Sequence, residues 1–191
     1  PAAPKLARPD GESTALVTAA GAPVAPPSAE DRRLTRQFIA VHSKSFYLSS
    51  LLLPRAIRQE AWALYAFCRQ ADDSVDGVNP GDGTVPADAP TDTAAMLEQV
   101  LGLRQRLARV YAGELGPGDA SAIDRAFRAV VVRTGLPQAV PQRLLAGMEM
   151  DARGVGYGSW EDLLGYCFNV AATVGLMMTY VMGHRMQPAA A

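Results

Sequence analysis

Apolar side chains recur at helical spacing along most of the chain, and no stretch alternates convincingly between apolar and polar residues as a half-buried strand does. The predicted fold class is therefore all-α. Breaks rich in Gly, Pro, Asn and Asp bound the predicted helices, which are 28–41, a short helix ending at 53, 54–76, 91–112, 119–134, 141–153 and 159–182. Residues 1–27 are rich in Pro, Ala and Gly, which predicts a disordered tail before one helical domain over 28–191.

Capping residues indicate where several of these helices begin. Ser28 follows two prolines and is placed to cap the first helix. Asp119 follows the break Gly116-Pro117-Gly118 and is expected to cap the helix that ends near Thr134. Ser159, with an aspartate three residues later, resembles a capping box at the start of the last helix.

Composition narrows the class of protein. The chain has 191 residues, of which 49% are hydrophobic, and its formal net charge is −1, so one globular domain is expected and nucleic acid is not an expected partner. Cys68 and Cys167 lie in apolar helical patterns, which predicts buried, reduced thiols and a cytoplasmic location. The first residues lack the pattern of a secretory signal. The apolar run 170–183 is short for a membrane span and predicts a core helix.

The helix over 54–76 carries the most informative polar residues. On a helical wheel Tyr65, Arg69, Asp72 and Asp76 share one face, whereas Asp73 lies roughly 80° to one side. Carboxylates this close repel one another unless a cation lies between them, and their oxygens suit Mg²⁺. A water-exposed polar face explains the same pattern. Acidic residues at a helix C-terminus oppose the macrodipole, however, and a bound cation would relieve that conflict.

The last predicted helix is apolar on nearly all sides. Tyr166, Val170, Thr173 and Met177 share one face, and Gly175 is among several small residues that let other helices approach. This face either packs in the core or lines a long apolar cavity, and spacing leaves both interpretations open. Neither histidine has a partner at metal-ligand spacing, so a zinc site is not expected, and nucleotide-binding loops are not found.

Several short sequence blocks, taken in order, closely resemble the squalene/phytoene synthase family. Their residues are most similar to those of the bacterial phytoene synthases. The resemblance covers about Thr35 to Gly183. Its blocks are His42-Ser43-Lys44-Ser45-Phe46-Tyr47, Leu52-Leu53-Pro54, Trp62–Arg69, Asp72-Asp73-Ser74-Val75-Asp76, Gly147-Met148-Glu149-Met150-Asp151 and Tyr166–Gly175.

The resemblance implies an isoprenoid-synthase helical fold around a central apolar cavity. It implies head-to-head condensation of two prenyl diphosphates, which in phytoene synthases are two geranylgeranyl diphosphates joined through a cyclopropyl intermediate, prephytoene diphosphate. The implied cofactor is Mg²⁺ or Mn²⁺, with no nicotinamide. The implied metal ligands are Asp72 and Asp76, with Arg69, Tyr65 and Tyr166 also catalytic. The implied substrate-binding residues are Ser43, Phe46, Asp73, Val170 and Gly175.

The family carries a second aspartate-rich motif on a later helix, and this sequence ends at Ala191 before any such motif. We therefore expect a domain that lacks its C-terminal helices and belongs to a longer enzyme of carotenoid biosynthesis, the alternative being an incomplete, inactive form. The alternatives are a squalene or dehydrosqualene synthase that uses farnesyl diphosphate, and a non-catalytic relative that acts as an assembly or interaction protein. Peripheral membrane contact is compatible with an amphiphilic substrate, although no basic amphipathic helix marks it.

Overall fold

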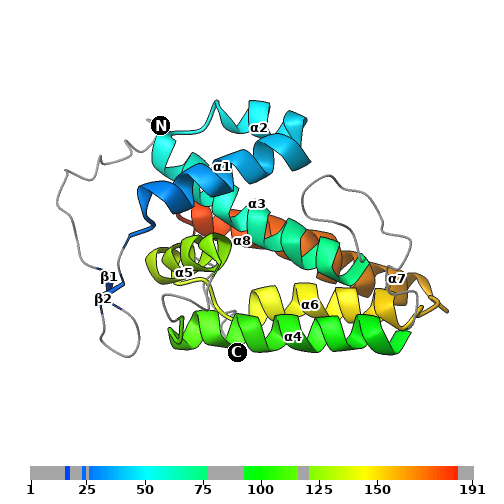
Figure 1. The fold of residues 1–191 in the computed structure, drawn as a ribbon. Coiled ribbons are helices and arrows are strands. Elements are labelled where there is room, and N and C mark those ends of the chain that lie inside the picture. Colours follow the sequence, from blue (N-terminus) through cyan, green and yellow to red (C-terminus); the bar gives the residue numbers. More distant parts are fainter. Residues whose placement is uncertain (1–15, 18–22, 25, 77–92, 116–120, 185–191) are drawn as a thin grey trace, which may run out of the picture.

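The computed structural model describes residues 16–17, 23–24, 26–76, 93–115 and 121–184. Helices dominate this part of the chain, which confirms the predicted all-α class (Figure 1). The helices are α1 (Ala29–His42), α2 (Lys44–Ser50), α3 (Arg55–Asp76), α4 (Thr93–Ala112), α5 (Ala122–Thr134), α6 (Ala139–Ala152), α7 (Trp160–Cys167), the π-helical turn η1 (Phe168–Ala172) and α8 (Thr173–Val181). Two short strands, β1 (Leu16–Val17) and β2 (Pro23–Val24), pair antiparallel.

Local capping explains where α1, α5 and α7 begin. Ser28 and Ser159 each accept a hydrogen bond from the backbone of the third helical residue, in capping boxes completed by Asp31 and Asp162. The predicted cap at Asp119 is wrong, because α5 starts at Ala122 and its cap is Ser121, in a box with Asp124. An aspartate three residues after Ser121 supplies the reciprocal bond.

Two predictions fall largely outside the described residues. The loop predicted over 77–90 lies there entirely. So does most of the tail predicted over 1–27, of which the structure describes the two strands and residues 26–27. The predicted tail and the domain bounds stay predictions.

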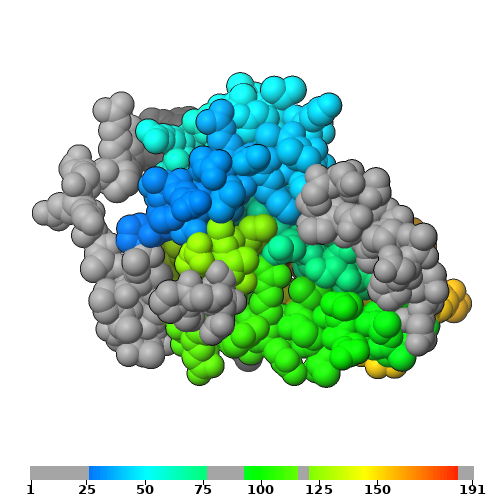
Figure 2. All heavy atoms as spheres, in the orientation of Figure 1, coloured from blue at the N-terminus to red at the C-terminus, as the bar shows by residue number. Residues whose placement is uncertain are grey.

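Helix α3 is the central element of the fold. It packs against α1, α5, α4 and α8, while α4 and α6 lie side by side along the lower edge in Figure 1. Aromatic stacking joins α3 to α5, since the rings of Phe67 and Phe127 are 4.0 Å apart at an interplanar angle of 8°. Both rings are buried and belong to one continuous apolar core with residues of α4, α6 and α8. In the space-filling view, α1 and α2 form the upper surface and α4 much of the lower one (Figure 2).

The last predicted helix is interrupted by a π-helical turn, η1, between α7 and α8. It is also less buried than a core helix: α7 has no buried residue, and Trp160 and Phe168 are exposed. The stretch Trp160–Val181 is long and apolar enough to cross a membrane, a property that core helices of soluble proteins share. Its buried residues form a single stripe: Asn169, Thr173, Met177, Tyr180 and Val181.

The two cysteines differ in environment. Cys68 retains some exposure, but its thiol is enclosed enough that burial raises its pKa to about 12. Cys167 is exposed, so the prediction of two buried thiols is wrong for this residue. Both are free thiols. The exposed position of Cys167 follows from the solvent-facing side of α7.

Candidate active site

A cavity of about 390 Å³ lies between α3 and the helices α2, α6 and α8, with η1 completing its wall. Most of its lining is apolar, and Arg69 and Asp72 supply a charged end. The cavity therefore combines a hydrophobic wall with a charged patch. Its lining residues are Phe46, Ala61, Leu64, Tyr65, Cys68, Arg69, Asp72, Leu144, Met148, Val170, Val174 and Met178.

Arg69 lies between two carboxylates of its own helix. Its Nη1 donates to Asp72 Oδ2 at 3.2 Å, and its Nη2 is 2.8 Å from Asp73 Oδ1. The second contact is close enough for an ion pair but is poorly aligned as a hydrogen bond, so both oxygens of Asp73 lack an aligned donor among the described residues. Asp73 is buried, whereas Asp72 is half exposed at the cavity. Asp73 thus lies behind Arg69 and anchors it.

Negative charge accumulates around Asp72. Burial raises the pKa of Asp72, and the charge of Asp76 one turn away raises it further. Asp73 and Asp151 act in the same direction, while Arg69 opposes them. A bound cation would relieve this repulsion.

The oxygen ligands available here fit Mg²⁺. This ion commonly takes one or two protein carboxylates and completes its coordination with water and substrate phosphates. Asp72 and Asp76 are the carboxylates that would hold it. No group of three or more His, Cys, Asp or Glu placed to hold a metal occurs in the described part of the chain, so phosphate oxygens and water would have to complete the shell.

Part of the cavity wall is built where α1 passes into α2. Ser43 ends α1 and caps α2, accepting a hydrogen bond from the backbone N–H of Phe46 at 3.4 Å. This places Phe46 against Tyr65, with ring centroids 5.3 Å apart. Burial raises the pKa of Tyr65, although a hydrogen bond with Ser43 opposes the shift. The phenol therefore stays protonated and ordered beside Arg69.

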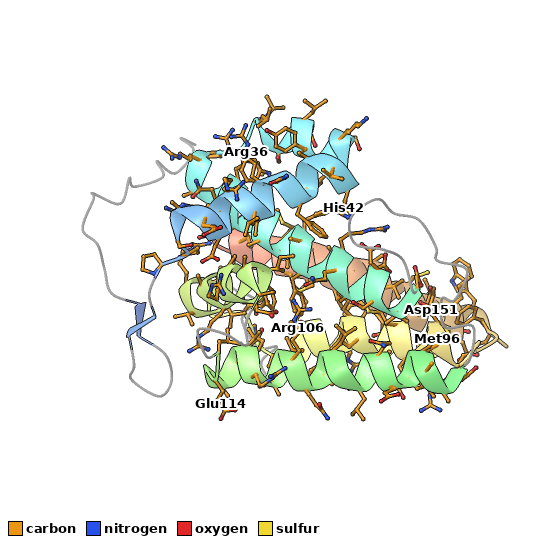
Figure 3. The ribbon with its side chains drawn as sticks, in the orientation of Figure 1. Arg36, His42, Met96, Arg106, Glu114 and Asp151 are labelled. Atoms are coloured by element: carbon orange, nitrogen blue, oxygen red, sulfur yellow. The ribbon has the colours of Figure 1, made fainter. Side chains whose placement is uncertain are left out.

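A second tyrosine, Tyr166 of α7, lies near the C-terminal end of α6. Tyr166 forms a hydrogen bond with Asp151, and this bond, with burial adding to it, raises the pKa of Tyr166 to about 12. Its ring is 5.1 Å from that of Tyr157. Figure 3 shows Asp151 at the right-hand end of α6, near the C-terminal end of α3, which agrees with its electrostatic effect on Asp72.

The structure brings half of the predicted site residues to the cavity wall, namely Phe46, Tyr65, Arg69, Asp72 and Val170. Ser43 and Asp73 lie directly behind that wall. Asp76 is exposed one turn beyond Asp72, and Tyr166 pairs with Asp151. Gly175 is exposed on α8, where an added Cβ would meet nothing within 4 Å. The roles assigned to all ten residues stay predictions.

Sequence reasoning missed two groups of residues. Asp151, which is exposed at the end of α6, was not among the predicted site residues, and only its place in the block Gly147–Asp151 pointed to it. The apolar wall from the later helices was also missed, because helical spacing does not separate cavity-lining side chains from core side chains. These wall residues are Leu144, Met148, Val174 and Met178.

Comparison with known proteins identifies the family. Residues 39–191 match the squalene/phytoene synthase family, which is most of the chain. The chain belongs to this family. Its structure agrees, because a dehydrosqualene synthase crystallised with a ligand superimposes with a TM-score of 0.64 at 28% identity, covering 80% of this chain and 47% of that one. A squalene synthase from Alicyclobacillus acidocaldarius gives a TM-score of 0.64 at 27% identity, covering 81% of this chain and 52% of the other.

Phytoene synthases are among the curated proteins that this chain resembles. The phytoene synthase of Cereibacter sphaeroides is 47% identical over 148 residues, which are 77% of this chain and 39% of that protein. The Rhodobacter capsulatus phytoene synthase is 43% identical over 80% of this chain and 40% of its own length. The chain therefore spans about two-fifths of the length of these relatives. The shared part includes every cavity-lining residue described above.

Proposed function

We propose that this protein forms phytoene by joining two geranylgeranyl diphosphates head to head, through prephytoene diphosphate, in carotenoid biosynthesis. The observation that carries the proposal is the cavity, whose apolar wall ends at Arg69 and the carboxylate of Asp72. Its dimensions and polarity suit a prenyl chain with a diphosphate at one end. The phytoene synthases among its relatives support the choice of product.

The charged end of the cavity would bind the diphosphate. Arg69 presents a planar guanidinium that suits phosphate oxygens, and Ser43 lies close to Tyr65 on the same side. Asp72 and Asp76 would hold Mg²⁺ or Mn²⁺, which supplies positive charge to the leaving diphosphate. In the absence of substrate Arg69 is paired with Asp72 and Asp73, so the same pairs keep it in position before diphosphate arrives.

The apolar wall would protect the reacting carbon from water. Departure of diphosphate leaves an allylic cation, and the side chains of Val170, Val174 and Leu144 offer it no nucleophile. The electron-rich rings of Phe46 and Tyr65 stack at one side of the cavity and would favour positive charge there. The raised pKa of Tyr65 keeps its hydroxyl a proton donor rather than a competing anion.

Product analysis tests this proposal. The protein is incubated with geranylgeranyl diphosphate or farnesyl diphosphate, with and without Mg²⁺, and the extracted hydrocarbons are identified by mass spectrometry. We expect phytoene from geranylgeranyl diphosphate and no product without the metal. Replacing Asp72 by Asn should lower the rate on the order of 100-fold, because a lost metal ligand costs several kcal/mol of transition-state stabilisation. The control is Glu114→Gln, an equivalent loss of one exposed carboxylate just beyond the end of α4.

A second candidate follows from the solved structures. Both similar structures are named for squalene or dehydrosqualene synthesis, whose substrate is the shorter farnesyl diphosphate. Conversion of farnesyl diphosphate alone would replace the phytoene assignment by this one. Absence of carotenoid from a reporter host that depends on the unchanged protein for phytoene would instead favour a non-catalytic relative.

A further inference from the structure

A groove of about 500 Å³ on the outside of the molecule is lined mainly by arginines. It lies between α1 and the first half of α3, and it shares no residue with the cavity described above. No acidic side chain is among its lining residues, which makes it strongly electropositive. Those residues are Ala29, Arg32, Arg33, Arg36, Leu51, Arg55, Arg58, Gln59 and Trp62.

Neighbouring aromatic rings hold two of these arginines in place. Arg36 donates from Nε to the hydroxyl of Tyr47 at 3.1 Å, and the guanidinium of Arg58 lies 5.7 Å from the Trp62 ring. Trp62 is itself fixed, since its Nε1 donates to Ser50 Oγ at 2.8 Å. These contacts order the side chains without neutralising their charge. Figure 3 shows Arg36 between α1 and α2 at the top of the molecule.

The other basic side chains are more open to solvent. Arg33 is 3.9 Å from Glu30, but both side chains are well exposed, so this pair neutralises little charge. Arg55 is exposed at the first position of α3. Arg32 contacts the carbonyl oxygen of Pro27. The groove therefore keeps most of its positive charge available to a ligand.

Exposed leucines border the same groove. Leu51 lines it, and its neighbours Leu52 and Leu48 are 90% and 63% exposed. All three lie on α2 or the turn that follows it. A single exposed leucine is ordinary on a protein surface, but three beside an arginine groove form an amphipathic surface. This combination is typical of proteins that lie at the membrane interface.

We propose that the arginine groove and Leu48, Leu51 and Leu52 together dock the protein on an anionic phospholipid bilayer. The arginines contact lipid phosphates, and the leucines enter the headgroup region. Charge argues for this occupant over a second copy of the same face, because two arginine grooves repel each other. A free phosphate or diphosphate would engage the arginines but would leave the leucines in water.

The distribution of charge over the chain determines which surface would face the membrane. The chain carries 18 Lys and Arg and 19 Asp and Glu, so its formal net charge is −1 and general attraction to an anionic surface is not expected. Positive charge concentrated on this groove would orient the upper surface of Figure 2 toward the lipid. The proposal is independent of the proposed reaction, since it concerns a different surface and needs no substrate.

Vesicle co-sedimentation tests the proposal. The protein is mixed with vesicles of phosphatidylcholine alone or with phosphatidylglycerol added, in the absence of prenyl substrates. We expect binding only to the anionic vesicles. The double variant Arg33→Gln/Arg55→Gln should weaken it on the order of 25-fold, at about fivefold for each charge near the lipid surface. Leu52→Ser should weaken it by about tenfold through lost apolar burial.

Two variants on the opposite side serve as controls. Arg109 and Leu101 are exposed on α4, at the lower edge of Figure 1, so Arg109→Gln and Leu101→Ser make matched changes there. Both should bind vesicles like the unchanged protein. Circular dichroism confirms that every variant is folded. Equal vesicle binding by all variants would overturn the proposal. So would binding that inorganic diphosphate abolishes but Leu52→Ser leaves unchanged, because the ligand would then be a free phosphate. Self-association of the protein that the double variant loses would overturn it as well.

Discussion

Replacing Gly147 by alanine should push α6 away from the π-helical turn η1. An ideal Cβ at Gly147 would lie 2.5 Å from Val170 Cγ1, 3.1 Å from Asn169 Cβ and 3.3 Å from the backbone nitrogen of Val170. The first distance is shorter than two carbon atoms permit. Rotation of the Val170 side chain would remove that clash but not the two others, so the turn itself must move.

Gly102 provides the matched control. It also lies inside a helix, α4, and a Cβ there would meet nothing within 4 Å. Replacing a glycine in a helix interior by alanine stabilises a protein by about 1 kcal/mol, because the unfolded chain loses conformational freedom. Gly102→Ala should show this gain alone. Gly147→Ala should show the same gain offset by an overpacking cost of about 1–3 kcal/mol.

The difference between the two variants isolates the packing cost. We expect Gly147→Ala to be less stable than Gly102→Ala by about 1–3 kcal/mol in urea denaturation, with an unchanged denaturant slope. In thermal unfolding this corresponds to a midpoint lower by about 2–4 °C per kcal/mol. Val170 also lines the cavity, so Gly147→Ala should alter ligand affinity there as well. Equal stabilisation by both variants would refute the close contact between α6 and η1.

Two further predictions concern ionisable side chains. Burial alone would raise the pKa of Asp31, but hydrogen bonds from Arg125 and Ser28 together hold it below its ordinary value of 3.8. A carboxyl group whose pKa is lowered on folding stabilises the protein above its ordinary pKa, and the stabilisation disappears as the pH falls through the lower folded value. Asp31→Asn should therefore cost about 1–3 kcal/mol near neutral pH, and its difference from the unchanged protein should shrink below pH 3.8 in denaturation curves; a difference independent of pH would contradict this. In the second, Asp151→Ala should lower the pKa of Tyr166 from about 12 toward its ordinary value of 10.0, because it removes the acceptor of the hydrogen bond that is the largest cause of the shift. NMR titration of Cζ-labelled tyrosine measures it, and an unmoved Tyr166 would exclude the Asp151 contact.

The sequence alone predicted where a helix begins when that start depends on residues close together in the sequence. Ser28 and Ser159 cap their helices as expected, since a capping box needs only residues three apart. The same rule explains the error at α5. Ser121 has Asp124 three residues later, whereas the residue three after Asp119 is Ala122, which offers no reciprocal bond. The capping-box spacing of Ser121 and Asp124 therefore predicts the observed start of α5.

The interruption of the last helix could not be predicted in this way. The turn lies where η1 approaches Gly147 of α6 closely, at Asn169 and Val170, which is a tertiary contact. The local sequence Phe168–Ala172 contains no proline or glycine that would announce an irregular turn. The extra residue in the turn changes the rotation of α8 relative to α7. Beyond the turn, Val174 and Met178 line the cavity, and Gly175, which only the family resemblance implied as substrate-binding, is exposed.

The aspartate cluster on α3 shows that a helical wheel gives the direction in which a side chain leaves the helix but not whether that side chain is buried. The wheel separated Asp73 from Asp72 and Asp76, and the structure places Asp73 2% exposed while Asp72 reaches the cavity. What buries Asp73 is packing against α1, which brings His42 close enough to lower its pKa although burial raises it overall. A buried carboxylate beside Arg69 costs free energy unless the guanidinium stays with it. The pair therefore restrains Arg69 at the charged end of the cavity, and the middle aspartate acts on the site through that arginine.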